Sequence, residues 1–140
     1  MAVNPQQKYL EVQIQTAPPE KLVTMLYSGA IKFMTQAKKN IENGELEKAH
    51  NNLVRAQDIF YELISGLNME AGEIAENLYK LYDFMIATLI EVNINKDPTK
   101  LVDIITMVSE LKEAWVEATS KVTGTGSANG DRFDLAKAGK

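Results

Sequence analysis

The chain has 140 residues, a formal net charge of −4 and no cysteine. This length suits one domain with a hydrophobic core, and the lack of cysteine excludes disulfides and thiolate metal sites. No apolar run is long enough to span a membrane, no basic cluster favours nucleic acid, and no secretory signal begins the chain, so we expect a cytoplasmic protein.

Residues 1–18 are polar and carry one small apolar set, which consists of Tyr9, Leu10, Val12 and Ile14. The spacing suits either a short extended piece or one side of a helix, and it does not choose between them. Burying the four side chains would stabilise by roughly 6–10 kcal/mol, whereas ordering about ten residues costs roughly 10 kcal/mol or more. We therefore expect a removable covering segment.

Pro19 is expected to begin the first helix, because a proline is tolerated at the first helical position. This helix should run to about Asn43, where Asn43 and Gly44 form a stop signal. A second helix, from about Glu45 to Leu67, has an apolar residue at every third or fourth position. That set is Leu46, Ala49, Leu53, Ala56, Phe60, Leu63 and Leu67. Such spacing predicts one apolar stripe that faces a core.

The third expected helix, from about Glu73 to Asn95, carries two adjacent apolar rows. The first row is Ile74, Leu78, Leu81, Met85 and Val92. The second row is Ala75, Tyr79, Tyr82, Ile86 and Leu89. A bundle helix needs only about a third of its surface apolar, so we expect the second row to be covered by the N-terminal segment, a partner helix or a second copy of the chain.

Asp97 and Pro98 predict the cap and first residue of a fourth helix that ends near Val122. Trp115 falls on its apolar stripe and is expected in the core, and the following glycines predict a flexible tail over residues 123–140. Four helices with short connections predict an all-α fold. We expect an antiparallel up-down four-helix bundle over residues 19–122, with a short N-terminal covering segment over residues 1–18.

The sequence shows no catalytic constellation. Glu47 and His50 match the Glu-x-x-His motif of di-iron bundles, but such a site needs two copies and His50 is the only histidine. We expect binding without catalysis, with no metal and no cofactor. Four tyrosines, Tyr27, Tyr61, Tyr79 and Tyr82, lie on or beside the apolar stripes, where tyrosine suits either the edge of the core or a groove for an apolar partner.

Five stretches in chain order carry a further signal. They are Thr16–Leu22 with Met25–Phe33, Arg55–Ile59 with Glu62 and Leu63, Ala75–Leu78 with Leu81–Met85, Asn93 and Ile94 with Asp97, and Leu111 with Ala114 and Trp115. Together they resemble the flagellin export chaperones, the FliS family, over nearly all of residues 5–118. Two positions depart from the family pattern: Pro18 replaces a serine or threonine, and Val92 replaces a common alanine.

The resemblance implies a cytoplasmic chaperone that binds the disordered C-terminal region of flagellin. It would prevent premature polymerisation and assist delivery to the flagellar type III export apparatus, without ATP. The expected client-binding residues, in the groove or its cover, are Tyr9, Leu10, Val12, Ile14, Tyr27, Ala75, Tyr79, Tyr82, Ile86 and Asn93. Direct binding of the export gate and of flagellar regulators stays open, as does the choice between a free monomer and a weak homodimer. The alternative is a structural bundle that dimerises through the second row of the third helix.

Overall fold

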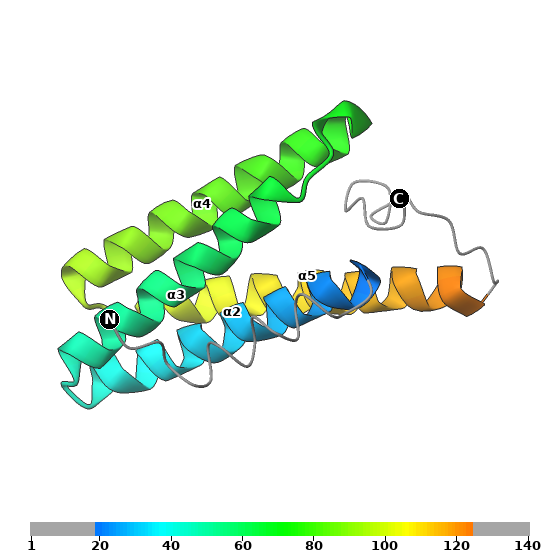
Figure 1. The fold of residues 1–140 in the computed structure, drawn as a ribbon. Coiled ribbons are helices and arrows are strands. Elements are labelled where there is room, and N and C mark those ends of the chain that lie inside the picture. The colour runs from blue at the N-terminus through cyan, green and yellow to red at the C-terminus, as the bar shows by residue number, and fades with distance from the viewer. Residues whose placement is uncertain (1–18, 125–140) are drawn as a thin grey trace, which may run out of the picture.

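The structure, a computed structural model, describes residues 19–124, which form four α-helices and one 3₁₀ turn (Figure 1). The elements are α2 (Pro19–Glu42), α3 (Leu46–Ser65), η1 (Met69–Ala71), α4 (Glu73–Asn95) and α5 (Thr99–Gly124). The all-α fold is confirmed, and successive helices run in opposite directions in Figure 1, in agreement with the expected antiparallel up-down bundle. Within this range no helix is both long and apolar enough to cross a membrane.

The helix ends follow local chemistry. Gly44 makes the turn between α2 and α3 with a φ of 75°, a conformation that favours glycine. Asp97 caps α5, because its Oδ1 accepts hydrogen bonds from the hydroxyl (2.7 Å) and the backbone N–H (3.0 Å) of Thr99. These bonds, chiefly the one from the hydroxyl, hold the pKa of the Asp97 carboxyl below its ordinary value.

The observed helix bounds agree with the expected ones within one or two residues. α4 has the expected bounds, α3 is slightly shorter at both ends, and α5 continues to Gly124 rather than ending near Val122. Differences of this size are usual because the last turns of helices fray. The break between α3 and α4 contains the turn η1, and Asn68 Oδ1 accepts the backbone N–H of Glu70 at 3.0 Å there.

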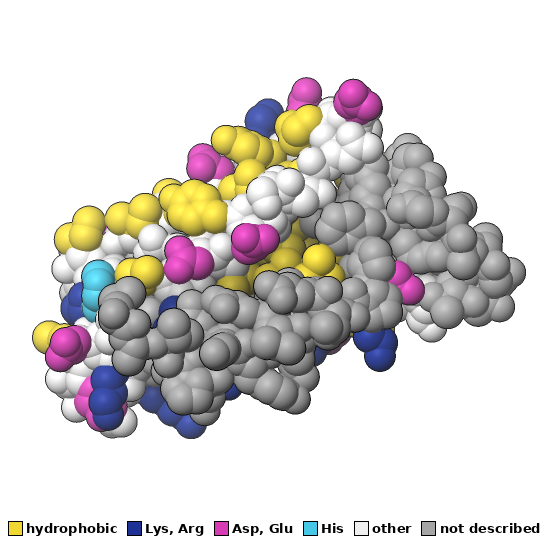
Figure 2. All heavy atoms as spheres, in the orientation of Figure 1, with side chains coloured by type: hydrophobic (Ala, Val, Ile, Leu, Met, Phe, Trp, Pro, Cys, Tyr) yellow, Lys and Arg dark blue, Asp and Glu magenta, His cyan; other side chains and the backbone are white. Residues whose placement is uncertain are grey.

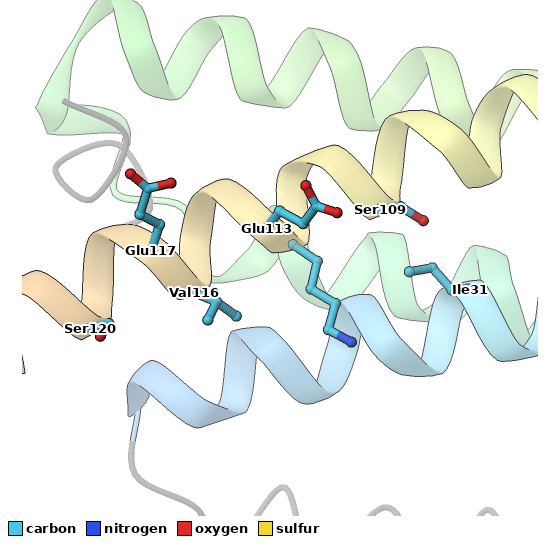
Figure 3. A pocket seen from close by; sticks show the side chains of 7 residues that line it. Ile31, Ser109, Glu113, Val116, Glu117 and Ser120 are labelled. Atoms are coloured by element: carbon cyan, nitrogen blue, oxygen red, sulfur yellow. The ribbon is translucent and has the colours of Figure 1, made fainter.

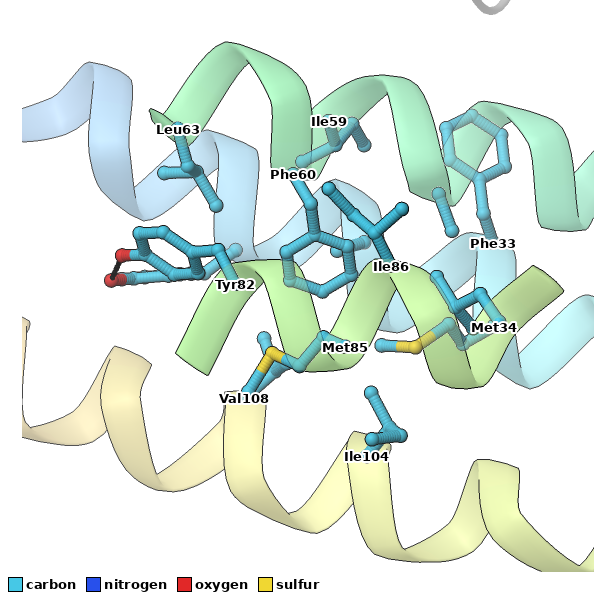
Figure 4. Packing of buried hydrophobic residues seen from close by; sticks show 14 of the residues in the cluster. Phe33, Met34, Ile59, Phe60, Leu63, Tyr82, Met85, Ile86, Ile104 and Val108 are labelled. Carbon is cyan, nitrogen blue, oxygen red and sulfur yellow. Dashed lines mark hydrogen bonds between the residues drawn. The ribbon is translucent and has the colours of Figure 1, made fainter. Parts of the chain in front are cut away.

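The four helices share one hydrophobic core (Figure 4). α2 packs on α3 and α5, α3 packs on α4, and the contact between α4 and α5 is sparse. The largest fully buried side chains are Met34, Leu53, Phe60, Leu63, Tyr82, Met85, Leu89, Val92, Leu101, Ile104 and Val108. Trp115 is also buried, and its Nε1–H donates to the carbonyl oxygen of Glu20 at 2.8 Å, which confirms its expected place in the core.

The structure corrects the expectation that the second apolar row of α4 needs a cover from outside the four helices. Ala75, Tyr82, Ile86 and Leu89 of that row are buried, and only Tyr79 is exposed. The ring of Tyr82 packs 6.2 Å from that of Phe60, centroid to centroid, so α3 covers this side of α4. α4 needs two apolar rows because it has a neighbouring helix on each side. The row that appeared surplus in the sequence is therefore mostly core.

A pair of buried tyrosines joins α2 to α4. The hydroxyls of Tyr27 and Tyr82 lie 2.6 Å apart, within hydrogen-bonding distance, as the dashed line in Figure 4 shows. Burial raises the pKa of Tyr27 to about 12, and burial together with the neighbouring Tyr27 raises the pKa of Tyr82. Both rings therefore stay neutral at physiological pH, and each hydroxyl supplies the only hydrogen-bonding partner that the other has among residues 19–124.

We predict that Tyr82→Phe lowers the free energy of unfolding by about 1–3 kcal/mol, because it leaves the hydroxyl of Tyr27 buried without a partner. The double variant Tyr27→Phe with Tyr82→Phe should lie closer to the original protein, since it removes both hydroxyls and keeps both rings. Urea unfolding followed by circular dichroism measures this. A double variant less stable than Tyr82→Phe alone would contradict the pairing.

Candidate binding surface

The outer side of α3 and α4 carries a continuous set of exposed apolar side chains. It is here called the α3–α4 face, and consists of Leu46, Val54, Tyr61, Tyr79, Ile90 and Ile94. Between 36% and 75% of each residue's surface is exposed. Figure 2 shows yellow side chains in a row along these two helices, with the cyan side chain of His50 beside them. A contiguous apolar patch of this kind marks an interaction site more often than scattered single residues do.

Helical spacing places the six residues on two facing rows. On α3 the row follows positions 46, 50, 54, 57 and 61, which are steps of three or four and so lie along one side of a helix. On α4 it follows the exposed positions 79, 83, 87, 90 and 94, again in steps of three or four. The two rows meet because Asn93 Nδ2 of α4 lies 2.9 Å from His50 Nδ1 of α3. With antiparallel helices, this register brings Val54 alongside Ile90.

A small polar cluster interrupts the apolar rows at the Asn95 end of α4. Lys96 ends α4 in the left-handed conformation, with a φ of 52°. Its Nζ donates to Asn93 twice, at 2.5 Å to the backbone carbonyl and at 2.6 Å to the side-chain Oδ1. The Asn93 amide therefore connects Lys96 to His50, while the apolar side chains of Leu46 and Ile94 flank the cluster.

The residues expected to bind a client divide into three groups. Tyr79 lies on the α3–α4 face and Asn93 at its polar cluster. Tyr27, Ala75, Tyr82 and Ile86 lie in the core, so a partner could contact them only if the bundle opened. Tyr9, Leu10, Val12 and Ile14, the expected cover, and the expected tail from residue 125 onward lie outside the described residues.

Sequence reasoning pointed to Tyr61 and Tyr79 but missed the other four residues of the α3–α4 face. Leu46 was assigned to the core, yet it is 49% exposed. Val54 and Tyr61 lie one step beside the core stripe of α3, and Ile90 and Ile94 continue the line of Tyr79 on α4. The signal was present in the spacing of Leu46, His50, Val54, Gln57 and Tyr61, which forms a second, partly apolar row beside the core row.

A second concave surface lies between α2 and α5. This groove of about 830 Å³ is lined by Ile31, Ser109, Lys112, Glu113, Val116, Glu117 and Ser120. In Figure 3 Val116 of α5 points toward α2 and Ile31 lies on α2, whereas Glu113 and Glu117 project from the other side of α5. Three of the seven carry charge and two are serines, so the groove is less suited to an apolar helix than the α3–α4 face.

The described residues do not assemble catalytic or metal-binding chemistry. Across residues 19–124 no three His, Asp or Glu side chains gather as metal ligands. His50 is exposed, and its hydrogen bond goes to Asn93 rather than to a carboxylate or a nucleophile. The arrangement suits the binding of apolar side chains that a partner presents on one side of a helix.

The described residues form an all-α helical bundle with an exposed apolar face along two helices, and comparisons with known proteins identify its family. The family model described as "Flagellar protein FliS" matches residues 2–122. The chain is similar to proteins named "Flagellar secretion chaperone FliS" from Bacillus subtilis (35% identity over 115 residues, 82% of this chain and 86% of that protein) and Vibrio cholerae (39% over 107 residues, 76% and 79%). It is also similar to the protein of that name from Salmonella typhimurium, with 32% identity over 116 residues, 81% of this chain and 86% of that protein.

The chain belongs to the FliS family, which confirms the resemblance seen in its five sequence stretches. The relatives are named as chaperones, a non-enzymatic role, in agreement with the expectation of binding without catalysis.

Proposed function

We propose that this protein is a flagellar secretion chaperone that holds the C-terminal region of flagellin in the cytoplasm before export. The observation that carries this proposal is the α3–α4 face, since an exposed apolar row on two adjacent helices is a ready groove for an amphipathic helix. The names of the relatives point to a client from the flagellum. Flagellin fits because a filament subunit is exported through the flagellum and must not polymerise beforehand.

The mechanism follows from the chemistry of the face. A disordered client segment would fold as a helix on the α3–α4 face and bury its own apolar side chains against Tyr61, Tyr79 and Ile90. Burial offsets the entropy lost when the segment becomes ordered. While bound, the segment is unavailable for contacts with other flagellin molecules. Release needs no chemical step, because the interaction is non-covalent and reversible.

The same face could instead pair with its counterpart on a second copy, as a structural dimer would. A two-fold axis would then bring the row of one protomer against the row of the other. The N-terminal apolar set is a further candidate occupant, and the cover that we expect over residues 1–18 stays a prediction. A chaperone requires that any such occupant be displaced by the client.

Titration with a peptide from the C-terminal region of flagellin tests the proposal. We expect a one-to-one isotherm in a calorimeter, a clearly negative heat-capacity change from apolar burial, and little loss of affinity in moderate salt. Binding that disappears in moderate salt would show that charge rather than apolar contact holds the client. No binding, with a mass that rises with protein concentration, would favour the dimer.

A further inference from the structure

The α3 row of the α3–α4 face contains a polar position whose hydrogen-bonding state the structure determines. His50 lies between Leu46 and Val54 on this row and is exposed. Its Nδ1 faces the side-chain amide of Asn93 at 2.9 Å. A histidine nitrogen can donate or accept depending on where the ring carries its proton, so the role of Nδ1 depends on which end of the Asn93 amide it meets.

Lys96 decides the orientation of that amide. A lysine ammonium can only donate hydrogen bonds, so the atom of Asn93 that lies 2.6 Å from Lys96 Nζ must be the oxygen Oδ1. The other end, Nδ2, then faces His50 and can only donate. Nδ1 of His50 must therefore accept, which places the proton of the neutral ring on Nε2. Lys96 and Asn93 together fix the tautomer of the histidine.

We infer that His50 is a specificity-determining residue of the α3–α4 face, and that its Nε2–H donates to an oxygen acceptor on the bound client helix. No group within residues 19–124 hydrogen-bonds to Nε2, so the donor is available to a partner. The inference rests on the proposed function, and it names a polar requirement that apolar burial does not supply. A client that places only apolar atoms over His50 would leave this donor buried and unpaired, at a cost in affinity.

The acceptor can be identified by its chemistry. The side-chain oxygen of an asparagine, glutamine, aspartate or glutamate can accept from Nε2–H, and so can a backbone carbonyl near the end of the client helix. The nearby ammonium of Lys96 adds positive charge to this end of the face. A client lysine or arginine over His50 is disfavoured, because it would place a donor against the Nε2–H donor and a positive charge near Lys96. The position thus discriminates between client segments of equal hydrophobicity.

Two leucine substitutions on the same row of α3 test the inference. His50→Leu removes the donor and adds apolar surface, whereas the matched control Gln57→Leu adds apolar surface at a position without a fixed donor. With the flagellin C-terminal peptide as ligand, we expect His50→Leu to weaken binding about three- to tenfold. Gln57→Leu should leave the dissociation constant unchanged or lower it.

Affinity that stays the same or improves in both variants would overturn the inference. If the original protein does not bind the peptide, the proposed function fails instead, so the two failures are distinguishable. Alanine scanning of the peptide locates the acceptor. If a client side chain supplies it, removing that side chain should abolish the difference in affinity between the original protein and the His50→Leu variant. If the client backbone supplies it, the difference should persist throughout the scan.

The tautomer can be measured in the chain without ligand. The ¹⁵N signals of the imidazole should show the Nε2–H form, and Lys96→Met should give a mixture of tautomers, because the Asn93 amide is then free to turn. A predominant Nδ1–H form in the original protein would overturn the inference independently of any client.

Discussion

Ile90→Asp should weaken binding of the flagellin C-terminal peptide by at least about a hundredfold, which corresponds to roughly 3 kcal/mol, while the bundle stays folded. Ile90 lies near the middle of the α3–α4 face and is 42% exposed in the free protein. A carboxylate there stays hydrated without the client but must lose its water beneath an apolar helix, where it finds no partner. The substitution is therefore expected to destabilise the complex with the client but not the free bundle.

Val102→Asp is the matched control. Val102 is 47% exposed, belongs to α5 and lies outside the α3–α4 face. Since an exposed substitution usually changes stability by no more than about 0.5 kcal/mol, both variants should unfold near the midpoint of the original protein. Calorimetry on the two variants separates the outcomes. Equal affinities for Ile90→Asp and the original protein would exclude the α3–α4 face as the client site, and a loss confined to Val102→Asp would move the site to α5.

Phe60→Ala should lower the free energy of unfolding by about 3–5 kcal/mol, a large part of the roughly 5–15 kcal/mol that stabilises a typical domain. Phe60 is fully buried and packs against the ring of Tyr82, so the substitution leaves a cavity at the contact between α3 and α4 (Figure 4). Urea unfolding followed by circular dichroism measures the change.

Tyr61, the residue that follows Phe60, is expected to affect binding rather than stability. Tyr61 is 54% exposed on the α3–α4 face, so Tyr61→Ala should cost little stability but weaken client binding. Two adjacent positions on one helix are thus expected to give opposite results in the two assays. Similar losses of stability in both variants would mean that Tyr61 belongs to the core, and the α3–α4 face would have to be redrawn without it.

The position of the candidate site was predicted only in part. The third helix was correctly expected to carry more apolar surface than one neighbour requires. Tyr79, for which the sequence left open the edge of the core or a groove, is exposed. Ala75, Tyr82 and Ile86 were misassigned to an open groove because helical spacing shows which residues share a side of a helix, not which helix packs against that side. With α3 seated on α4, the exposed row shifts to Ile90 and Ile94.

The sequence by itself determined the helices and much of the core. Spacing in threes and fours identified Leu53, Phe60 and Trp115 as buried, and the signals at Gly44 and Asp97 located two of the turns, because helix periodicity and capping depend on residues close together in the chain. Contacts between distant residues required the tertiary structure. The hydrogen bonds of Tyr27 with Tyr82 and of His50 with Asn93 join positions 55 and 43 residues apart. Their formation depends on the rotation and register of packed helices, which many side chains set together and no local pattern encodes.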